Sequence, residues 1–216
     1  MELVGKKIAF LGDSITQGCG CSTFDNGFVG VFGRKTGAQA LNYGIGGTRI
    51  ARKHRKSADP IWDNCFLDRV DIMDRDAECV VVFGGTNDFG HGDGGLGVFE
   101  DSDEYSFYGA LHSLIRRLLQ RYPDRKIVFM TPLHRLSENE TVSEIGLPRA
   151  KLIDYVRAIR EVCEYYSIPV IDAYASSGLQ PAVALLKDRY MPDGLHPNNA
   201  GAVRLASFVE GALRAL

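Results

Sequence analysis

The sequence predicts an α/β protein: a three-layer α/β/α sandwich around a sheet of five parallel strands. Short apolar runs alternate along the chain with segments of helical periodicity, which is the order typical of parallel sheets. The apolar runs are mostly continuous, as expected for strands that are covered on both faces. The length of 216 residues fits one domain, residues 1–216, with a core large enough to need no disulfide bonds.

The predicted strands are short and rich in valine and isoleucine. They cover residues 8–11, 40–43, 79–83, 127–130 and 170–172. In a parallel sheet of this kind, ligands bind beyond the carboxyl ends of the strands. The segments that follow the strands are therefore the first place to look for chemistry.

Four helices are predicted from apolar residues spaced three or four apart. The first begins at Asp59-Pro60, where a capping side chain precedes a proline, and its expected apolar stripe is Trp62, Phe66, Val70 and Met73. The others are expected over residues 108–122, 152–166 and 198–213. The last one must return to the first strand if the two ends of the chain are to share a site.

Two connections are too long to be plain turns. Residues 89–104 contain five glycines and then four acidic residues, and residues 133–147 contain three glutamates. Both follow strand ends, so both are expected on the edge of the sheet where the first strand ends. Residues 89–104 could be a mobile lid or ordinary surface, and the sequence leaves both interpretations open.

Composition excludes several classes of protein. A net charge of −2 lacks the basic excess of a nucleic-acid-binding protein, and no apolar run is long enough to cross a membrane. The five cysteines form no C-x-x-C pair, and the chain begins without a signal-like segment, which favours reduced thiols and a cytoplasmic location. The histidines form no H-E-x-x-H motif, so neither a metal nor a cofactor is expected.

A serine follows the first predicted strand, in Gly12-Asp13-Ser14-Ile15-Thr16. A serine hydroxyl attacks a carbonyl only when a base removes its proton. The best candidate base is His196, and Asp193 is close enough in sequence to orient its ring. The α/β-hydrolase motif G-x-S-x-G is absent, because Thr16 occupies the position of the second glycine.

Two further strand ends offer hydrogen-bond donors for the negative oxygen that develops during acyl transfer. The second strand is followed by Gly44-Ile45-Gly46-Gly47-Thr48, where a backbone N–H can approach a ligand closely. The third is followed by Gly84-Gly85-Thr86-Asn87-Asp88, which offers the side-chain amide of Asn87. Serine, glycine, asparagine and histidine thus follow one another at successive positions suited to one site.

These four blocks together resemble the SGNH hydrolases, also called the GDSL esterase/lipase family. The resemblance spans nearly the whole chain, and Ile15 replaces the usual leucine of the first block. It implies a flavodoxin-like sandwich, with Ser14 as nucleophile, His196 as base and Asp193 as the residue that orients the histidine. The oxyanion donors would be the N–H groups of Ser14 and Gly47 and the side chain of Asn87.

The residues around these blocks suggest what surrounds a substrate. Asp13, Gly46, His91 and His134 are expected at the pocket, and Asp13 and Asp88 are expected to hold loops in shape and not to react. A basic run follows the glycines: Arg49, Arg52, Lys53, His54, Arg55 and Lys56. It is either a solvated loop or a site that recognises an anionic group on the substrate.

The predicted function is a serine esterase that cleaves a carboxylic ester through an acyl-enzyme. Short acyl groups, acetyl above all, are expected because the chain has no apolar segment typical of a lipid-binding cap, and the substrate is a small molecule or a carbohydrate ester. Alternatives are an acyltransferase that uses the same residues, a lysophospholipase or thioesterase, and, least favoured, a non-catalytic ligand-binding module.

Overall fold

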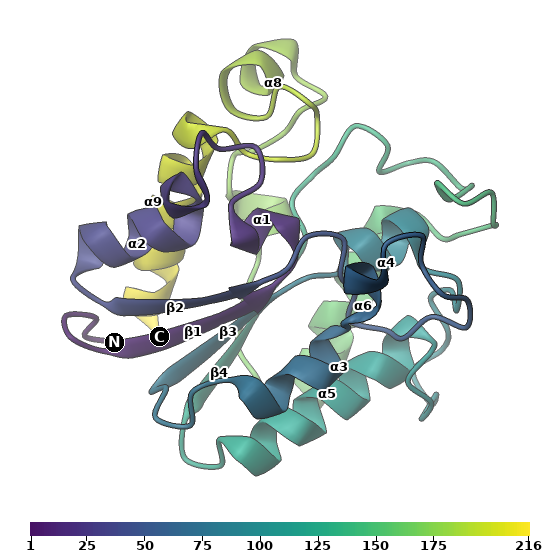
Figure 1. The fold of residues 1–216 in the computed structure, drawn as a ribbon, viewed down its shortest axis with the longest axis horizontal. Helices are drawn as coiled ribbons and strands as arrows, with labels where there is room; N and C mark the ends of the chain where they lie inside the picture. Colours follow the sequence, from purple (N-terminus) through teal and green to yellow (C-terminus); the bar gives the residue numbers. More distant parts are fainter.

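The computed structural model describes residues 1–216 and contains one sheet of five parallel strands (Figure 1). The strands lie in the order β2-β1-β3-β4-β5. Their bounds are β1 Lys7–Gly12, β2 Gln39–Gly44, β3 Cys79–Phe83, β4 Lys126–Met130 and β5 Val170–Ile171. This is the strand order of flavodoxin-like sheets, in which ligands bind where the order of the strands reverses, between β1 and β3. The predicted fold class is confirmed.

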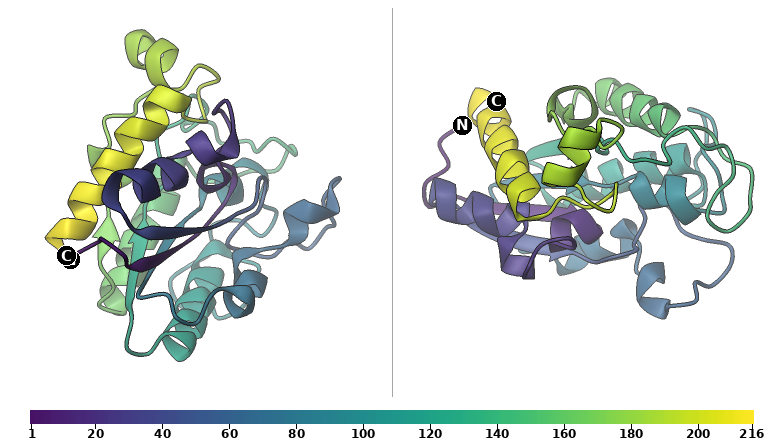
Figure 2. Two further views of the ribbon diagram at one scale, coloured as in Figure 1. Left: turned by 60° about the vertical axis from the view of Figure 1, so that its left-hand side comes forward. Right: turned by 90° about the horizontal axis from the view of Figure 1, so that it is seen from above.

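Helices cover both faces of the sheet (Figures 1 and 2). One face carries α2 (Phe28–Thr36) and α9 (Asn199–Ala215), which pack against each other. The other carries α3 (Phe66–Arg69), α5 (Phe107–Arg121) and α6 (Leu152–Tyr165). The remaining short helices are α1 Ser14–Gln17, α4 Thr86–His91, α7 Ala173–Ser176, α8 Ala184–Tyr190, and the 3₁₀ turns η1 Phe24–Asn26, η2 Pro60–Asp63 and η3 Val70–Ile72.

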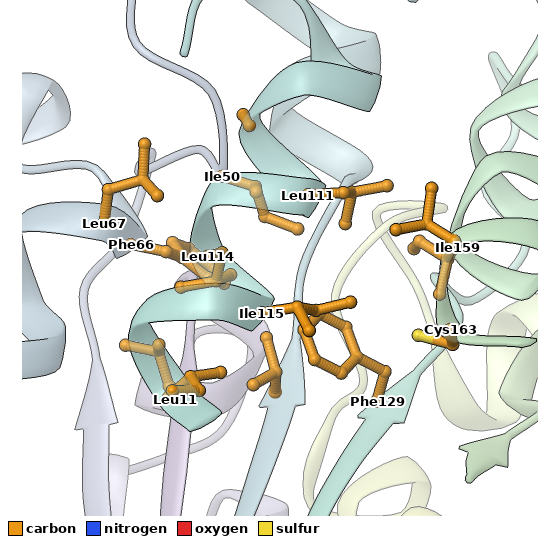
Figure 3. Packing of buried hydrophobic residues seen from close by; sticks show 14 of the residues in the cluster. Leu11, Ile50, Phe66, Leu67, Leu111, Leu114, Ile115, Phe129, Ile159 and Cys163 are labelled. Atoms are coloured by element: carbon orange, nitrogen blue, oxygen red, sulfur yellow. The ribbon is translucent and has the colours of Figure 1, made fainter. Parts of the chain in front are cut away.

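Side chains of the central strands pack into two separate cores, because successive side chains of a strand point to opposite faces. In β1, Ile8 and Phe10 pack under α2 and α9, whereas Ala9 and Leu11 face α3 and α5. Figure 3 shows the second of these cores, where Leu11 and Phe129 meet side chains of α3, α5 and α6. Continuous apolar runs are needed here because each strand must fill both cores.

The ends of the first three strands are in register. Gly12 of β1 lies opposite Gly44 of β2 and Phe83 of β3. The segments that follow these strands therefore leave the sheet at one edge.

The last helix returns the carboxyl end of the chain to β1. The Asn198 side chain caps α9 by accepting a hydrogen bond from the Gly201 N–H at 3.0 Å. At the far end of α9 the amino group of Met1 donates to the Leu213 carbonyl at 2.9 Å, so the two termini lie together (Figure 1). The predicted helix over 198–213 is confirmed.

The helix predicted from Asp59 to Met73 is wrong. Asp59 and Pro60 do begin a helical turn, but it is the short η2, and α3 and η3 follow as separate pieces. Trp62 is 37% exposed and belongs to no core, whereas Phe66 is buried. Tertiary contacts interrupt the helix, since the Asp63 carboxylate bonds to Ser57 and the Phe66 N–H donates to the carbonyl of Arg49.

Helix α2 was not predicted, because its two glycines and its threonine have low helix propensity. Gly30 is required by packing: a Cβ at this position would collide with the Asp25 carbonyl oxygen. Two boundaries also differ. Residues 89–91 are the last turn of α4, so the long connection begins later, and Asp172 caps α7 and does not extend β5.

None of the helices combines the length and the apolar character that a membrane-spanning segment requires. All five cysteines are free, and Cys65, Cys79 and Cys163 are buried. Cys163 and Cys79 fill apolar positions, one in each of the two cores.

Leu205→Ala is expected to destabilise the fold by about 2–5 kcal/mol, because this α9 side chain is fully buried between the helix and the sheet. Leu185→Ala is the matched control: Leu185 is 74% exposed, so its truncation should change stability by less than about 0.5 kcal/mol. Urea unfolding of both variants measures the difference. Equal stabilities would contradict the placement of α9.

Candidate active site

Ser14, His196 and Asp193 form a continuous row of hydrogen bonds. The hydroxyl oxygen of Ser14 lies 3.0 Å from His196 Nε2, and His196 Nδ1 lies 2.7 Å from Asp193 Oδ2. A carboxylate only accepts hydrogen bonds, so Nδ1 carries the proton and Nε2 is left to accept from the Ser14 hydroxyl. In this tautomer the ring can take up the serine proton while the carboxylate stabilises the resulting positive charge.

A tight turn holds the acid and the ring together. Asp193 Oδ1 accepts hydrogen bonds from the N–H groups of Leu195 (2.9 Å) and His196 (2.7 Å). Partial burial alone would raise the pKa of Asp193, but these donors and the His196 ring lower it below its ordinary value. Leu136, from the 133–147 connection, packs on Gly194 and donates its N–H to the Gly194 carbonyl at 3.0 Å.

Two backbone N–H groups are free to bind a ligand beside Ser14. As the first residue of α1, Ser14 has no acceptor for its N–H within the helix. The Gly47 N–H also has no acceptor in the protein, whereas the Gly46 N–H donates to Gln17 Oε1 at 2.8 Å. The two neighbouring glycines therefore differ in the structure: the N–H of Gly47 is a free donor and the N–H of Gly46 is not.

Asn87 lies in the first turn of α4, directly beyond β3, and is 7% exposed. Its amide nitrogen donates one hydrogen to the Thr48 carbonyl at 2.9 Å. The side-chain amide is thus fixed against the loop that carries Gly47, and its second hydrogen is left for a ligand. The donors of Ser14, Gly47 and Asn87 thus follow three adjacent strands and lie at the same edge of the sheet, which is where acyl transfer would require them.

Buried polar side chains hold these loops in place. Asp13 caps α1 by accepting from the Ile15 N–H at 3.0 Å. Asp88 accepts from the N–H groups of Ile50 and Ala51, and thereby joins α4 to the loop after β2. Both aspartates have the structural contacts that were predicted for them. Asp13 is only 2% exposed, so its carboxylate offers little surface to a ligand.

The buried Arg69 also holds the ends of these strands and loops together, and this role was not predicted from the sequence. Its guanidinium donates to the carbonyls of Gly12 and Tyr43, at the ends of β1 and β2, and to Thr48 Oγ1 at 2.9 Å. Burial lowers the pKa of Arg69 to about 10. An arginine within the apolar pattern of residues 66–73 was the signal available in the sequence. The Gln17 contact with Gly46 had no such signal.

Trp62 and His91 form a wall beside the free donors. The Trp62 ring packs on Gly47, whose φ of +74° and whose lack of a Cβ allow this contact. His91 lies one helical turn after Asn87 in α4, and its ring centroid is 5.4 Å from that of Trp62. His91 therefore lies where the sequence predicted a pocket residue, whereas Trp62 was assigned to a helix stripe.

His134 is placed differently. Its Nδ1 lies 2.7 Å from Glu138 Oε2 and its ring packs on Tyr174. None of these contacts involves the residues of the Ser14 site. No group of three or more histidine, cysteine, aspartate or glutamate side chains lies close enough to hold a metal ion.

The structure divides the basic run into two kinds of residue. Arg49 is 1% exposed, and Arg52 forms ion pairs with Asp68 and Glu104. Three cations remain without an acidic partner: Lys53, Arg55 and Lys56. The acidic end of the 89–104 connection is thus held in place through Glu104, whose carboxylate also forms an ion pair with Arg117 at 2.6 Å.

Comparisons with known proteins agree with this geometry. The sequence profile of the GDSL-like lipase/acylhydrolase family matches residues 10–204. No curated protein sequence is significantly similar to the chain. One solved crystal structure is 38% identical, with a TM-score of 0.87, over 100% of this chain and 99% of its own.

Two further solved structures show how widely the fold is shared. A protein from Lactobacillus plantarum is 28% identical, with a TM-score of 0.81, over 99% of this chain and 98% of its own. A salicylyl-acyltransferase from a tetracycline biosynthetic pathway is 18% identical, with a TM-score of 0.68, over 98% of this chain but 55% of its own. At 18% identity the likeness shows the fold alone.

Asp13→Asn is expected to flatten the pH dependence of stability. Burial raises the pKa of Asp13 from 3.8 to about 6, so the folded protein binds this proton more tightly than the unfolded chain. The wild type therefore loses stability as the pH rises from about 4 to 6. Asparagine still accepts from the Ile15 N–H but stays neutral. Relative to the wild type, the variant should gain on the order of 2–3 kcal/mol between pH 4 and pH 7.

Urea unfolding at the two pH values measures this change. Asp188→Asn is the control, because the Asp188 side chain is 78% exposed and should show no comparable gain. If the stability difference between Asp13→Asn and the wild type is the same at pH 4 and pH 7, the buried carboxyl does not titrate as described.

Proposed function

The chain belongs to the GDSL-like lipase/acylhydrolase family, which hydrolyses ester bonds, and on this premise we propose that it is a serine esterase that cleaves short-chain carboxylic esters through an acyl-enzyme. The observation that carries the proposal is the row of hydrogen bonds from Ser14 Oγ to His196 Nε2 and from His196 Nδ1 to Asp193 Oδ2. A binding module would have no need for this alignment.

In the first half of the proposed reaction, Ser14 Oγ attacks the ester carbonyl carbon while His196 Nε2 accepts its proton. Asp193 stabilises the imidazolium. The carbonyl oxygen becomes an oxyanion held by the N–H groups of Ser14 and Gly47 and by the Asn87 amide. The C–O bond then breaks, and the imidazolium gives its proton to the departing alcohol.

In the second half, water takes the place of the alcohol. His196 removes a proton from the water as it attacks the acyl-serine, and returns that proton to Ser14 Oγ when the carboxylic acid leaves. The same three donors hold the second oxyanion. Their orientation is fixed before the substrate arrives, because Asp88 and Arg69 hold the loops that carry them.

The surroundings of Ser14 favour a short acyl group, such as acetyl, over a fatty-acyl chain. The apolar cavity under α1, between Ile15 and Phe28, has a free volume near 0 Å³. The hollow bounded by Trp62 and His91 is lined mostly by polar and charged side chains. Neither is an enclosed apolar tunnel that could take up a long alkyl chain. This supports a small or carbohydrate ester over a lysophospholipid.

A second candidate is an acyltransferase that uses the same serine. It is favoured by the similarity in fold to the salicylyl-acyltransferase. The two functions differ only in whether water or an alcohol reaches the acyl-serine. Product analysis with an acetyl ester and an added sugar alcohol separates them, because a transferase yields the new ester in excess of free acetate.

Ser14→Ala is expected to lower kcat/KM for p-nitrophenyl acetate by at least about 10⁴-fold, because no other hydroxyl lies beside His196. Ser102→Ala, an exposed serine with no hydrogen bond to the site, is the control and should keep the wild-type rate. A fluorophosphonate probe should label the wild type and Ser102→Ala but not Ser14→Ala. Full activity in Ser14→Ala would remove Ser14 from the mechanism.

Asn87→Ala is expected to reduce kcat by roughly 10²–10³-fold with a smaller effect on KM, because the lost donor acts mainly on the developing oxyanion. Asn139→Ala, an exposed asparagine in the 133–147 connection, should leave both constants unchanged. Steady-state kinetics with p-nitrophenyl acetate test this. A kcat for Asn87→Ala within a factor of two of the wild-type value would exclude its role in the oxyanion hole.

A further inference from the structure

A hollow of about 260 Å³ lies beside the Ser14 site and plays no part in the chemistry described above. We call it the basic hollow. It is lined by Lys53, Arg55, Lys56, Ser57, Ala58, Trp62, His91 and Ile145. It has no acidic residue in its lining and is large enough for a small polar group.

Only one layer of side chains separates the basic hollow from the oxyanion donors. Trp62 lines the hollow and also packs on Gly47. His91 lines the hollow and lies one turn along α4 from Asn87. A substrate whose carbonyl oxygen is held by Gly47 and Asn87 therefore extends into the basic hollow when it passes over these two rings.

A buried arginine joins the His91 ring to the backbone of Trp62. The Arg49 guanidinium is 1% exposed and donates to His91 Nδ1 at 3.0 Å, to the Trp62 carbonyl at 2.9 Å and to Asp63 at 3.2 Å. The wall between the catalytic serine and the basic hollow is thus held by hydrogen bonds as well as by packing. Such a fixed wall loses little conformational entropy when a ligand binds.

The two rings also present hydrogen-bond donors. Burial and the neighbouring Arg49 cation lower the pKa of His91 to about 4, so its ring is neutral at pH 7. Since Nδ1 accepts from Arg49, the ring hydrogen is on Nε2, which has no partner in the protein. The indole N–H of Trp62 has no partner either. Both are donors suited to an oxygen-rich group.

Three cations surround these donors. Lys53, Arg55 and Lys56 form no ion pair. Two acids lie nearby: the Asp93 carboxylate accepts from the backbone of His54 and Arg55, and Glu144 pairs with Arg135. The same cations also border a second hollow, but the carboxylate of Asp63 lines that one. Positive charge therefore predominates at the basic hollow, whose lining holds three cations and no carboxylate.

We propose that the basic hollow binds an anionic group, a carboxylate or a phosphate, that the ester substrate carries a few bonds from its scissile carbonyl. This inference rests on the proposed esterase function and narrows its substrate class to anionic esters. The anion would lie among Lys53, Arg55 and Lys56 and accept hydrogen bonds from His91 and Trp62. The charge can belong to the acyl group or to the alcohol, and the test separates these sources.

The test compares pairs of esters that differ in one charge. For the acyl side the pair is monomethyl adipate and methyl hexanoate; for the alcohol side it is 3-acetoxybenzoate and 3-methylphenyl acetate. The wild type should prefer the anionic member of at least one pair in kcat/KM. The triple variant Lys53→Gln, Arg55→Gln, Lys56→Gln should reduce that preference by about tenfold, as should 0.5 M KCl in the wild type.

The matched control is Arg75→Gln, Arg116→Gln, Arg125→Gln, which removes three unpaired, exposed arginines away from the site. It changes the net charge equally and should keep the wild-type preference. Binding supplies a second readout that needs no turnover: Ser14→Ala should bind monomethyl adipate or 3-acetoxybenzoate more tightly than the neutral partner, and the added triple substitution should abolish the difference.

The outcomes separate the inference from the proposed function. Hydrolysis that depends on Ser14 but shows no anionic preference, or a preference that the triple variant retains, overturns the inference and leaves the esterase in place. Absence of hydrolysis overturns the esterase, and the binding comparison then still decides whether the basic hollow holds an anion. A preference limited to one pair assigns the charge to that side of the ester.

Discussion

The hydrogen bond between Ser14 Oγ and His196 Nε2 joins residues 182 positions apart, and the rest of the site depends on it. It forms because α9 packs on α2 and on the same face of the sheet, which returns the turn before α9 to the end of β1. The buried α9 side chains that secure this return lie far from the reacting atoms. The packing of α9 therefore both stabilises the fold and aligns His196 with Ser14.

Buried charges fix the loops around that hydrogen bond. Arg69 holds the ends of β1 and β2, and Asp88 joins α4 to the loop that follows β2. Burial of an ion costs free energy, and the raised pKa of Asp88, about 6, reflects that cost. The hydrogen bonds that offset it also join the helix that carries Asn87 to the loop that carries Gly47. The geometry of the site is thus maintained at a cost in the free energy of folding.

The basic segment after the glycines combines two tasks. Arg49 turns inward and holds the His91 ring and the Trp62 backbone, whereas Lys53, Arg55 and Lys56 form no ion pair and line the basic hollow. Arg49 helps to hold the wall that separates the basic hollow from Ser14. The other three cations attract anions from solution, and salt screens that attraction. This division is the structural basis of the proposed preference for a charged ester.

The sequence by itself determined the sheet and the candidate residues, because strand runs, strand-end glycines and the Ser14 and His196 blocks are local patterns. It did not reveal α2, whose glycines serve packing, or the break after η2, which Asp63 and Arg49 impose through contacts distant in sequence. The family resemblance pointed to Gly47 as the donor, but only the tertiary structure shows why: the Gln17 side chain accepts from the Gly46 N–H and leaves the Gly47 N–H free. The position of the Gln17 side chain depends on the packing of α1 beside β2, which no local sequence pattern encodes.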